Sequence, residues 1–127
     1  MRIVGLGIDA VEIARIEGLL RSPTRNWAAG IFSAAEREQA DEAPLDARYY
    51  ASRFAAKEAV GKALGTGLAG DVTIHTIEIL RLASGAPTVN VIGGAREVAD
   101  ALGVNQWLIS ITYSGGLAMV TVLAIAN

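Results

Sequence analysis

The chain has 127 residues, of which 52% are apolar and 19% are charged. This length suits one domain with its own core, and the apolar content excludes a disordered chain. The net charge of −2 argues against general nucleic-acid binding, and the absence of cysteine excludes disulfides and cysteine-ligated zinc. No apolar run approaches the ~20 residues of a transmembrane helix, and the first residues carry no signal-peptide pattern. We therefore expect a single domain over residues 1–127 with a cytoplasmic location.

The first elements are a short strand and a helix. Residues 3–7 predict a buried strand that ends in Asp9, and apolar residues at helical spacing predict a helix over residues 13–20. Ser22 and Pro23 follow and would end that helix.

Two further helices are expected before the middle of the chain. Ser33 and Glu36 fit a capping box, in which the two side chains satisfy free amides at a helix start. After Pro44, Asp46 is a candidate cap for a long helix that runs to about Gly65. The acidic stretch in this region most simply forms a solvated helix and loop, and it consists of Glu36, Glu38, Asp41, Glu42 and Asp46.

The second half of the chain has mostly strand character. Two pairs of strand-like segments are each joined by a glycine-containing turn, and a short helix ended by Gly103 lies between the pairs. The predicted segments are strands 76–82 and 87–92, the helix 95–102, and strands 107–112 and 117–126. The class is therefore α+β, with N-terminal helices packed on an antiparallel sheet.

The last predicted strand carries only one polar side chain, Thr121, over residues 117–126. Successive side chains of a strand point to opposite faces, so a strand with one face in water alternates apolar and polar residues. This strand instead needs both faces covered. A chain of this size has few helices for a second face, which favours a subunit interface; burial of the whole strand within one monomer is the alternative.

Residues 5–10 match the G-x-G-x-x-G/A pattern of dinucleotide-binding folds. In those folds the glycines admit a pyrophosphate to a helix N-terminus. Here no second parallel strand is predicted to follow, and the carboxylate of Asp9 would repel a pyrophosphate unless a cation lay between them. The context therefore argues against a nicotinamide-binding domain.

Four charged residues form a candidate site for phosphate chemistry. Glu58 and Lys62 lie four residues apart on the long predicted helix and so share one face. Magnesium is usually bound by one or two carboxylates together with phosphate oxygens and waters. Asp9 and Glu58 could supply the carboxylates, while Lys62 and Arg53 face a diphosphate that shares the metal. The alternative is a plain Glu58–Lys62 pair, which would stabilise the helix by about 0.2–0.5 kcal/mol.

Two longer strings are more specific than this spacing. Residues 7–16, Gly-Ile-Asp-Ala-Val-Glu-Ile-Ala-Arg-Ile, resemble the G-x-D-x-V-E-I-x-R-I opening of bacterial holo-acyl-carrier-protein synthases. Residues 53–67 begin Arg-Phe-Ala-Ala-Lys-Glu-Ala and resemble the R-F-x-x-K-E-A-x-x-K-A-x-G signature of the same family. Shorter matches lie at residues 32–36, 84–87 and 107–112. The resemblance covers essentially the whole chain.

The resemblance implies a 4′-phosphopantetheinyl transferase fold and a magnesium-dependent reaction. In this reaction a serine of apo acyl carrier protein attacks the β-phosphate of coenzyme A, takes up 4′-phosphopantetheine and releases adenosine 3′,5′-bisphosphate. The positions that match the family's catalytic residues are Asp9, Glu58 and Lys62. Magnesium would lie between the carboxylates of Asp9 and Glu58 and the coenzyme diphosphate. Either Glu58 or a magnesium-bound water would activate the serine, and Lys62 would assist the leaving group.

The resemblance also implies binding surfaces and an assembly. The coenzyme A-binding positions correspond to Arg53, Lys62, Gly65, Ser110 and Thr112. The first helix of the family docks on the acidic carrier, and the docking candidates on this chain are Arg15, Arg21 and Arg25. The family is typically a homotrimer with active sites between neighbouring subunits, which would use the apolar last strand.

One position departs from the family pattern. Many relatives have a histidine or an acidic residue after the Ser-x-Thr of the penultimate strand, where this chain has Tyr113. Tyrosine can stack or donate one hydrogen bond but carries no charge near neutral pH. Two alternatives therefore stand beside a holo-acyl-carrier-protein synthase. One is a paralogue that performs the same reaction on a polyketide or peptide carrier, and the other is a catalytically silent homologue that binds coenzyme A.

Overall fold

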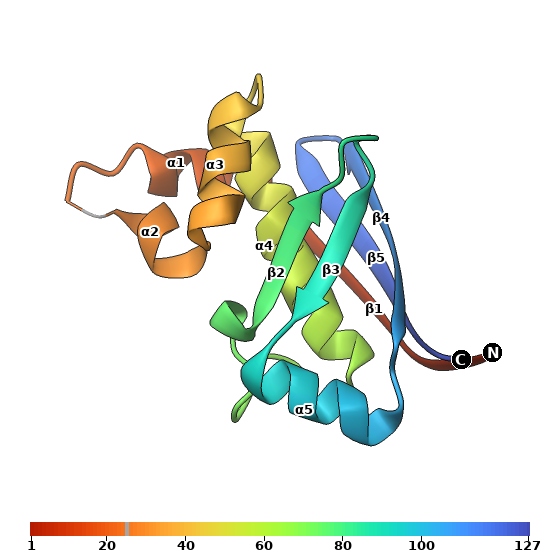
Figure 1. The fold of residues 1–127 in the computed structure, drawn as a ribbon. Coiled ribbons are helices and arrows are strands. Elements are labelled where there is room, and N and C mark those ends of the chain that lie inside the picture. Colours follow the sequence, from red (N-terminus) through yellow and green to blue (C-terminus); the bar gives the residue numbers. More distant parts are fainter. Residues whose placement is uncertain (25) are drawn as a thin grey trace.

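Helices occupy most of the first half of the chain and strands predominate over helices in the second in the computed structural model, which describes residues 1–24 and 26–127 (Figure 1). The chain order is β1 (Arg2–Glu12), α1 (Ile13–Leu20), α2 (Trp27–Ile31), α3 (Ala34–Glu42), α4 (Asp46–Ala63), a 3₁₀ turn (Ile74–Thr76), β2 (Ile77–Arg81), β3 (Pro87–Val91), α5 (Gly93–Leu102), β4 (Gln106–Ser114) and β5 (Leu117–Ala126). This is the α+β class expected from the sequence. No helix in the described parts of the chain has the length and apolar character needed to cross a membrane.

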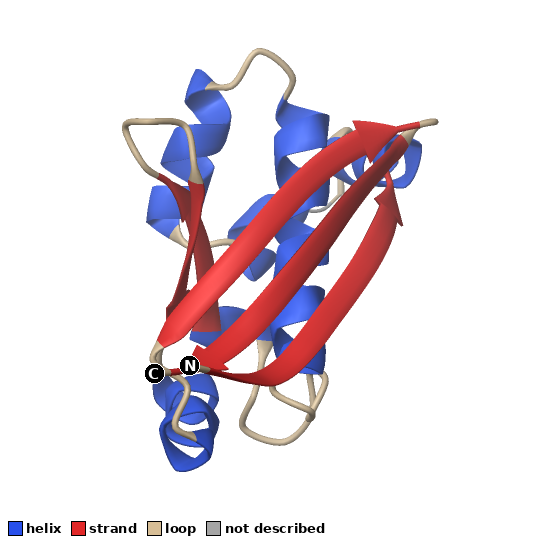
Figure 2. Ribbon diagram, turned by 90° about the vertical axis from the view of Figure 1, so that its right-hand side faces the viewer, coloured by secondary structure: helices blue, strands red, loops and turns tan. Residues whose placement is uncertain are grey.

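The strands form two separate antiparallel units. β1, β5 and β4 make a three-stranded sheet in that order, and β2 and β3 make a hairpin. β4 and β5 are joined by a turn at Gly115 and Gly116, whose positive φ angles of 58° and 78° suit a two-residue hairpin. β1 pairs with β5 so that Arg2 lies opposite Ala126, and the two ends of the chain therefore lie side by side (Figures 1 and 2).

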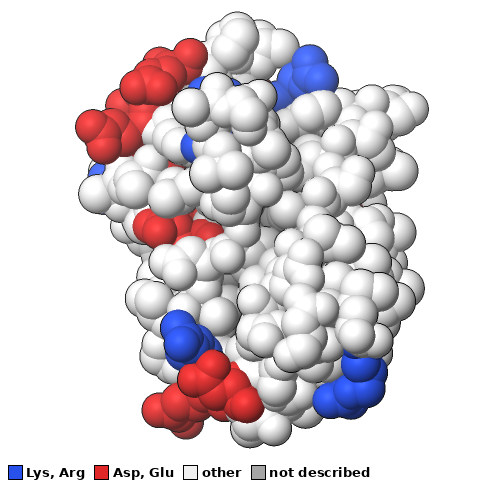
Figure 3. Space-filling model, turned by 45° about the vertical axis from the view of Figure 1, so that its right-hand side comes forward, with Lys and Arg blue, Asp and Glu red and all other residues white. Residues whose placement is uncertain are grey.

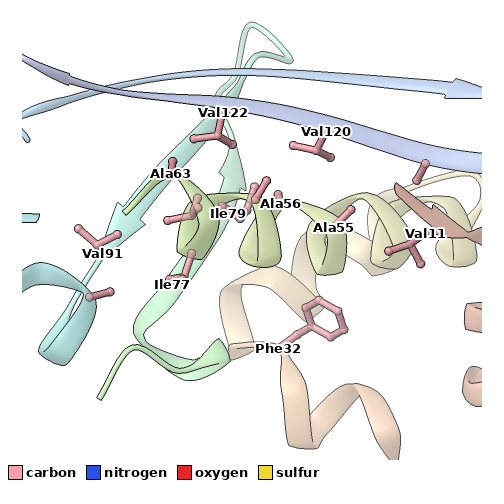
Figure 4. Packing of buried hydrophobic residues seen from close by; sticks show 14 of the residues in the cluster. Val11, Phe32, Ala55, Ala56, Ala63, Ile77, Ile79, Val91, Val120 and Val122 are labelled. Atoms are coloured by element: carbon pink, nitrogen blue, oxygen red, sulfur yellow. The ribbon is translucent and has the colours of Figure 1, made fainter. Parts of the chain in front are cut away.

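The long helix α4 is the centre of the core. One side of it faces Val120 and Val122 of β5, and another faces Ile77 and Ile79 of β2 (Figure 4). Small side chains let these layers approach closely, and the buried alanines of α4 include Ala51, Ala55, Ala56, Ala59 and Ala63. α4 is therefore held between the three-stranded sheet and the β2–β3 hairpin.

Two glycines of β1 allow α4 to pack directly on the strand. A Cβ atom at Gly5 would lie 1.8 Å from the carbonyl oxygen of Ala63, and one at Gly7 would lie 1.8 Å from that of Ala59. No side chain fits at such a distance, so both positions require glycine. The G-x-G-x-x-G/A pattern thus serves helix–strand contact, and no parallel strand pair of a dinucleotide-binding fold occurs among the described residues.

Most of the predicted elements are confirmed, but the first strand is longer than expected. The helix over residues 13–20, the capping box at Ser33 and both hairpins are present. β1 continues to Glu12, so the prediction that Asp9 ends a strand is wrong. The strand is extended by pairing with β5, where Val120 lies opposite Asp9, and local sequence patterns cannot reveal so distant a partner.

The start of α4 also differs from the prediction. Asp46 is the first helical residue, and the preceding Leu45 provides no side-chain cap. The Asp46 carboxylate instead accepts a hydrogen bond of 2.9 Å from Arg21, which joins the end of α1 to the start of α4. The short helix α2 has no counterpart in the prediction.

A buried ion pair links α3, α4 and β2. Lys57 Nζ lies 2.9 Å from Glu36 Oε1, and both side chains are buried. Lys57 also donates to the carbonyl oxygens of Ile74 and Ile77, and Glu36 accepts a hydrogen bond of 2.9 Å from the amide of Ile79. Glu36 is therefore a core residue, and the prediction of a solvated acidic face is wrong at this position.

One face of the three-stranded sheet is not covered by this chain. Figure 2 shows the helices behind the sheet and its near face bare. Leu6, Ile8 and Leu108 on this face are between 49% and 61% exposed, and Met119 and Leu123 of β5 beside them are half-buried. On the side that comes forward in Figure 3, a broad area carries no charged side chains, which lie at its margins. The alternative in which one monomer buries the whole last strand is therefore wrong.

Candidate active site

Asp9, Glu58 and Lys62 come together where β1 packs on the C-terminal half of α4. Lys62 Nζ lies 3.3 Å from Asp9 Oδ1 and donates a hydrogen bond of 3.0 Å to the carbonyl oxygen of Ile8. Lys62 therefore reaches from the helix to the strand. No ion pair joins Lys62 to Glu58 within the described residues, so the alternative of a plain helix pair is wrong.

Both carboxylates of this cluster are half-buried. Burial raises the pKa of Glu58, the charge of Asp9 raises it further, and the charge of Lys62 partly opposes the rise. The influence of Asp9 means that the two carboxylates repel each other across the gap between β1 and α4. A cation between them would remove this repulsion.

The cluster fits a magnesium ion that arrives together with a phosphate. The described residues contain no group of three or more acidic, histidine or cysteine side chains that could hold a metal by themselves. Magnesium needs fewer, because it keeps several waters and is commonly bound by one or two carboxylates plus substrate phosphates. Asp9 and Glu58 supply two carboxylates of this kind, and Lys62 adds a positive charge beside them.

Gly65 lies beside this cluster, immediately after the end of α4. Its φ angle of 82° is in the left-handed region, where glycine is favoured, and its amide donates to the carbonyl oxygen of Lys62 at 3.0 Å. The chain turns away sharply here and leaves Lys62 half-exposed at the helix end. Gly65 and Lys62, two of the predicted coenzyme-binding residues, are therefore neighbours.

Arg53 lies on a different side of the same helix. Nine residues separate it from Lys62, which at 100° per residue places the two side chains on opposite sides of α4, about 14 Å apart along the axis. Arg53 is only 5% exposed and lines a pocket of about 500 Å³ between α4, β4 and the β2–β3 hairpin. We call this the arginine pocket; its polar lining side chains are Arg48, Tyr49, Arg53, Arg81, Ser110 and Tyr113.

The arginine pocket has the chemistry of an anion site. Its lining contains three guanidinium groups and no carboxylate, and none of the three is in an ion pair with any described residue. Arg53 donates to Ser52 at 2.9 Å and lies 4.0 Å from the centre of the Tyr49 ring, but its buried Nε atom has no hydrogen-bond partner there. A buried charge without a counter-ion is costly, and a bound anion would remove that cost.

The predicted coenzyme-binding residues thus fall into separate groups. Arg53 and Ser110 meet in the arginine pocket, Lys62 and Gly65 lie across α4 from it, and Thr112 is exposed on β4 outside the pocket lining. The sequence prediction missed Arg48 and Arg81. No short motif contains these two arginines, and only their common positive charge could have marked them.

The docking candidates have unlike environments. Arg15 is exposed on α1, and no described carboxylate forms an ion pair with it. Arg21 is held at 2.9 Å by Glu17 and at 2.9 Å by Asp46, so part of its charge is already neutralised. Arg25 lies outside the described residues.

Comparison with known proteins gives a consistent family. The model of the 4′-phosphopantetheinyl transferase superfamily matches residues 5–116. The chain is 46% identical over 121 residues to a holo-[acyl-carrier-protein] synthase from Maridesulfovibrio salexigens, covering 95% of this chain and 97% of the relative. The crystal structure of the holo-[acyl-carrier-protein] synthase from Neisseria meningitidis superimposes with a TM-score of 0.85 at 31% identity, covering 98% of this chain and 99% of that chain.

A further solved structure holds a ligand. The holo-(acyl-carrier-protein) synthase from Bacillus anthracis, in complex with CoA (3′,5′-ADP), superimposes with a TM-score of 0.80 at 30% identity, covering 98% of each chain. The family match spans both Asp9 and Glu58 and both sides of α4. The chain belongs to the 4′-phosphopantetheinyl transferase superfamily.

Proposed function

We propose that this chain is a holo-acyl-carrier-protein synthase, which transfers 4′-phosphopantetheine from coenzyme A to a serine of apo acyl carrier protein. The observation that carries the proposal is the contact of Lys62 with Asp9 next to the half-buried Glu58. This arrangement suits a diphosphate and a magnesium ion, and it occurs in a chain 46% identical to a holo-[acyl-carrier-protein] synthase.

The side chains of the cluster have separate tasks in this reaction. Asp9 and Glu58 would hold magnesium, which neutralises charge on the coenzyme diphosphate. The serine oxygen forms a bond to the β-phosphorus, and the bond from that phosphorus to the bridging oxygen breaks. Glu58 would accept the serine proton, directly or through a water. Lys62 pairs with the phosphate of the departing adenosine 3′,5′-bisphosphate.

The complete site forms between two copies of the chain in a homotrimer. Two observations support this part of the proposal. Arg53 and Lys62 lie on opposite sides of α4 and face different surroundings. The bare apolar face of the three-stranded sheet also provides a surface for a second copy (Figure 2). The catalytic cluster of one subunit would then face the arginine pocket of its neighbour.

Complementation between two inactive variants tests the shared site. Glu58→Gln disables the catalytic cluster and Arg53→Gln disables the arginine pocket. If each site uses Glu58 of one subunit and Arg53 of the next, refolding the two variants together at equal amounts restores about one quarter of the sites. If mixed assemblies form by native mass spectrometry but no activity returns, the site lies within one subunit.

Arg15 is proposed to contact the acidic carrier. Arg15 is exposed on α1 and forms no ion pair with a described residue. The guanidinium of Arg21, in contrast, is paired with the carboxylates of Glu17 and Asp46. We expect Arg15→Glu to raise the KM for the carrier about tenfold without changing the KM for coenzyme A. Arg96→Glu on α5 is the matched control. Equal effects of both variants would show a general charge effect and no docking at Arg15.

Intact mass spectrometry tests the reaction itself. Apo acyl carrier protein is incubated with this protein, coenzyme A and magnesium, and the expected gain is one phosphopantetheine group, abolished by a chelator. No gain with apo acyl carrier protein but a gain with a polyketide or peptide carrier would identify a paralogue. No gain with any carrier, while coenzyme A still binds, would identify a silent homologue and overturn the proposal.

A further inference from the structure

The head of Lys62 lies against one of the two carboxylates assigned to the metal. Its Nζ atom is 3.3 Å from Asp9 Oδ1 and donates a hydrogen bond of 3.0 Å to the carbonyl oxygen of Ile8. The side chain of Asp9 is only 21% exposed, whereas that of Lys62 is 50% exposed. Because water screens a partly buried pair less than a surface pair, this contact draws the charge of Lys62 to the carboxylate.

The end of α4 fixes the backbone of Lys62 and leaves its head free to turn. The amide of Gly65 donates to the carbonyl oxygen of Lys62 at 3.0 Å, and the amide of Thr66 donates to that of Gly61 at 3.2 Å. These two bonds close the helix at a glycine with positive φ. The ammonium group stands on a flexible four-carbon stem that is half in solvent, so it can leave Asp9 without disturbing the core.

Lys62 competes with magnesium for the carboxylate of Asp9. A magnesium ion lies about 2.1 Å from its ligand oxygens, so an ion bound to Asp9 would bring its charge close to an ammonium group held 3.3 Å from Oδ1. Burial raises the pKa of Glu58, the charge of Asp9 raises it further, and the charge of Lys62 lowers it. All three charges therefore act on one another across the site.

The charge balance of the cluster depends on the coenzyme diphosphate. Two carboxylates and one ammonium group leave one net negative charge, and a divalent ion alone would convert this to one net positive charge. Both phosphates of the diphosphate are negatively charged at neutral pH, and they would give Lys62 another anion to pair with. The positive charge of Lys62 thus opposes a metal ion that comes alone, but not one that comes with the diphosphate.

We propose that Lys62 makes metal binding depend on coenzyme A, because it competes with the metal for Asp9 until the diphosphate draws it away. The inference rests on the proposed function and deepens it, since it gives Lys62 a second task besides pairing with the leaving group. Metal and coenzyme then raise each other's affinity by the same factor. The protein by itself holds the metal weakly, so that the metal enters the site with the substrate.

Binding of manganese in place of magnesium tests this coupling without any carrier protein. Free Mn²⁺ is measured by electron paramagnetic resonance for the wild type and Lys62→Met, with and without coenzyme A, and Mn²⁺ bound to coenzyme A alone is subtracted. We expect coenzyme A to tighten Mn²⁺ binding to the wild type about 50-fold. We expect Lys62→Met to bind Mn²⁺ alone about tenfold more tightly, which reduces the effect of coenzyme A about tenfold.

Three further variants separate the charge of Lys62 from the loss of its side chain. Lys62→Arg keeps a positive charge and should keep Mn²⁺ binding weak without coenzyme A. Arg96→Gln removes a positive charge that is paired with Asp100 on α5, and it should leave every Mn²⁺ affinity unchanged. Asp9→Asn should lose Mn²⁺ binding with or without coenzyme A, which verifies the place of the metal.

Thermal melting gives a second measure and shows that each variant is folded. A ligand that binds the folded state raises the melting temperature, so Mn²⁺ alone should raise it more for Lys62→Met than for the wild type.

Two results would overturn the inference. If Lys62→Met binds Mn²⁺ no more tightly than the wild type, Lys62 does not compete with the metal. If coenzyme A tightens Mn²⁺ binding equally in both proteins, Lys62 does not carry the coupling. Failure of the proposed function is distinguishable, because a protein that shows coupled binding but transfers nothing to any carrier keeps this inference and fails the mass-spectrometric assay.

Discussion

The proposed reaction needs Glu58 in its charged form, but burial and the nearby charge of Asp9 disfavour that form. Its raised pKa arises from burial and from the charge of Asp9. Between the ordinary carboxyl pKa and this raised value, the folded protein binds more protons than the unfolded chain. The free energy of unfolding therefore falls as pH rises through that window. The charge of Glu58 therefore weakens the apo fold at neutral pH, where the proposed reaction would use it.

Replacing Glu58 with glutamine should separate stability from activity. We expect Glu58→Gln to lose at least about 100-fold in transfer rate, because it removes a base and a metal ligand. In the presence of chelator, the variant should equal or exceed the wild type in stability at neutral pH, and the gap should close as pH falls through the raised pKa. Urea unfolding at several pH values checks this. A variant with near-normal turnover would contradict the role of Glu58.

Lys57 and Glu36 show the opposite case, a buried charge pair with a structural role. Lys57 donates hydrogen bonds to the backbone carbonyls of Ile74 and Ile77, and its charge is paired with Glu36. Removing either charge therefore leaves the other buried without a counter-charge. We expect Glu36→Ala to lower the free energy of unfolding by about 3–5 kcal/mol. The double variant Glu36→Leu and Lys57→Met should be more stable than either single variant. Urea denaturation measures this, and simple additivity of the two changes would contradict it.

At the scale of elements, the contact between β1 and α4 determines the site. The strand carries Asp9 and the helix carries Glu58 and Lys62, so their distance depends on how closely the backbones approach. Gly7 permits that approach, since a Cβ atom there would overlap the carbonyl oxygen of Ala59. A change in this packing should therefore affect stability and catalysis together.

Two glycine-to-alanine variants test the close approach. Gly7→Ala should lower the free energy of unfolding by at least about 1–3 kcal/mol and reduce transfer, because the helix must move away from β1. Gly18→Ala is the matched control: it lies in α1 with open space around it and should stabilise the protein by about 0.5–1 kcal/mol. Equal effects of the two variants in urea denaturation would show that the packing at Gly7 is not tight.

At the scale of the whole molecule, no element of the same chain covers the outer face of the three-stranded sheet in the described structure (Figure 2). Its inner face is filled by α4, and its outer face presents leucine and isoleucine side chains to solvent. Exposed apolar area of this extent is typical of an interface. The proposed homotrimer uses this surface and would place each catalytic cluster next to a neighbour's arginine pocket.

A charged substitution on this face should dissociate the assembly. We expect Leu6→Glu, on the outer face, to give a folded monomer with little transfer activity, because a buried charge at the interface is strongly unfavourable. Ile92→Glu is the control, since Ile92 is 53% exposed between β3 and α5 and lies outside both the three-stranded sheet and the lining of the arginine pocket. Size-exclusion chromatography with light scattering measures the mass. A monomeric wild type would contradict the assembly.

The elements of this fold could be predicted largely from local patterns, and the errors have a common cause. Helical spacing, the capping box at Ser33 and the glycine turn at Gly115 act within a few residues, and all three are confirmed. The predicted end of the first strand at Asp9 and the predicted exposure of Glu36 are wrong. Both depend on partners far along the chain, which become neighbours only when the sheet and the core form.

The sequence by itself determined the family, the reaction class and the candidate residues Asp9, Glu58 and Lys62, because strings of residues in a given order carry that information. Only the tertiary structure decided that Lys62 pairs with Asp9 instead of Glu58, and that Arg48 stacks on Tyr113 beside an unpaired arginine cluster. The physical reason is that charge pairing depends on distance in space. That distance is set by backbone packing between β1, α4 and β4 and not by separation along the chain.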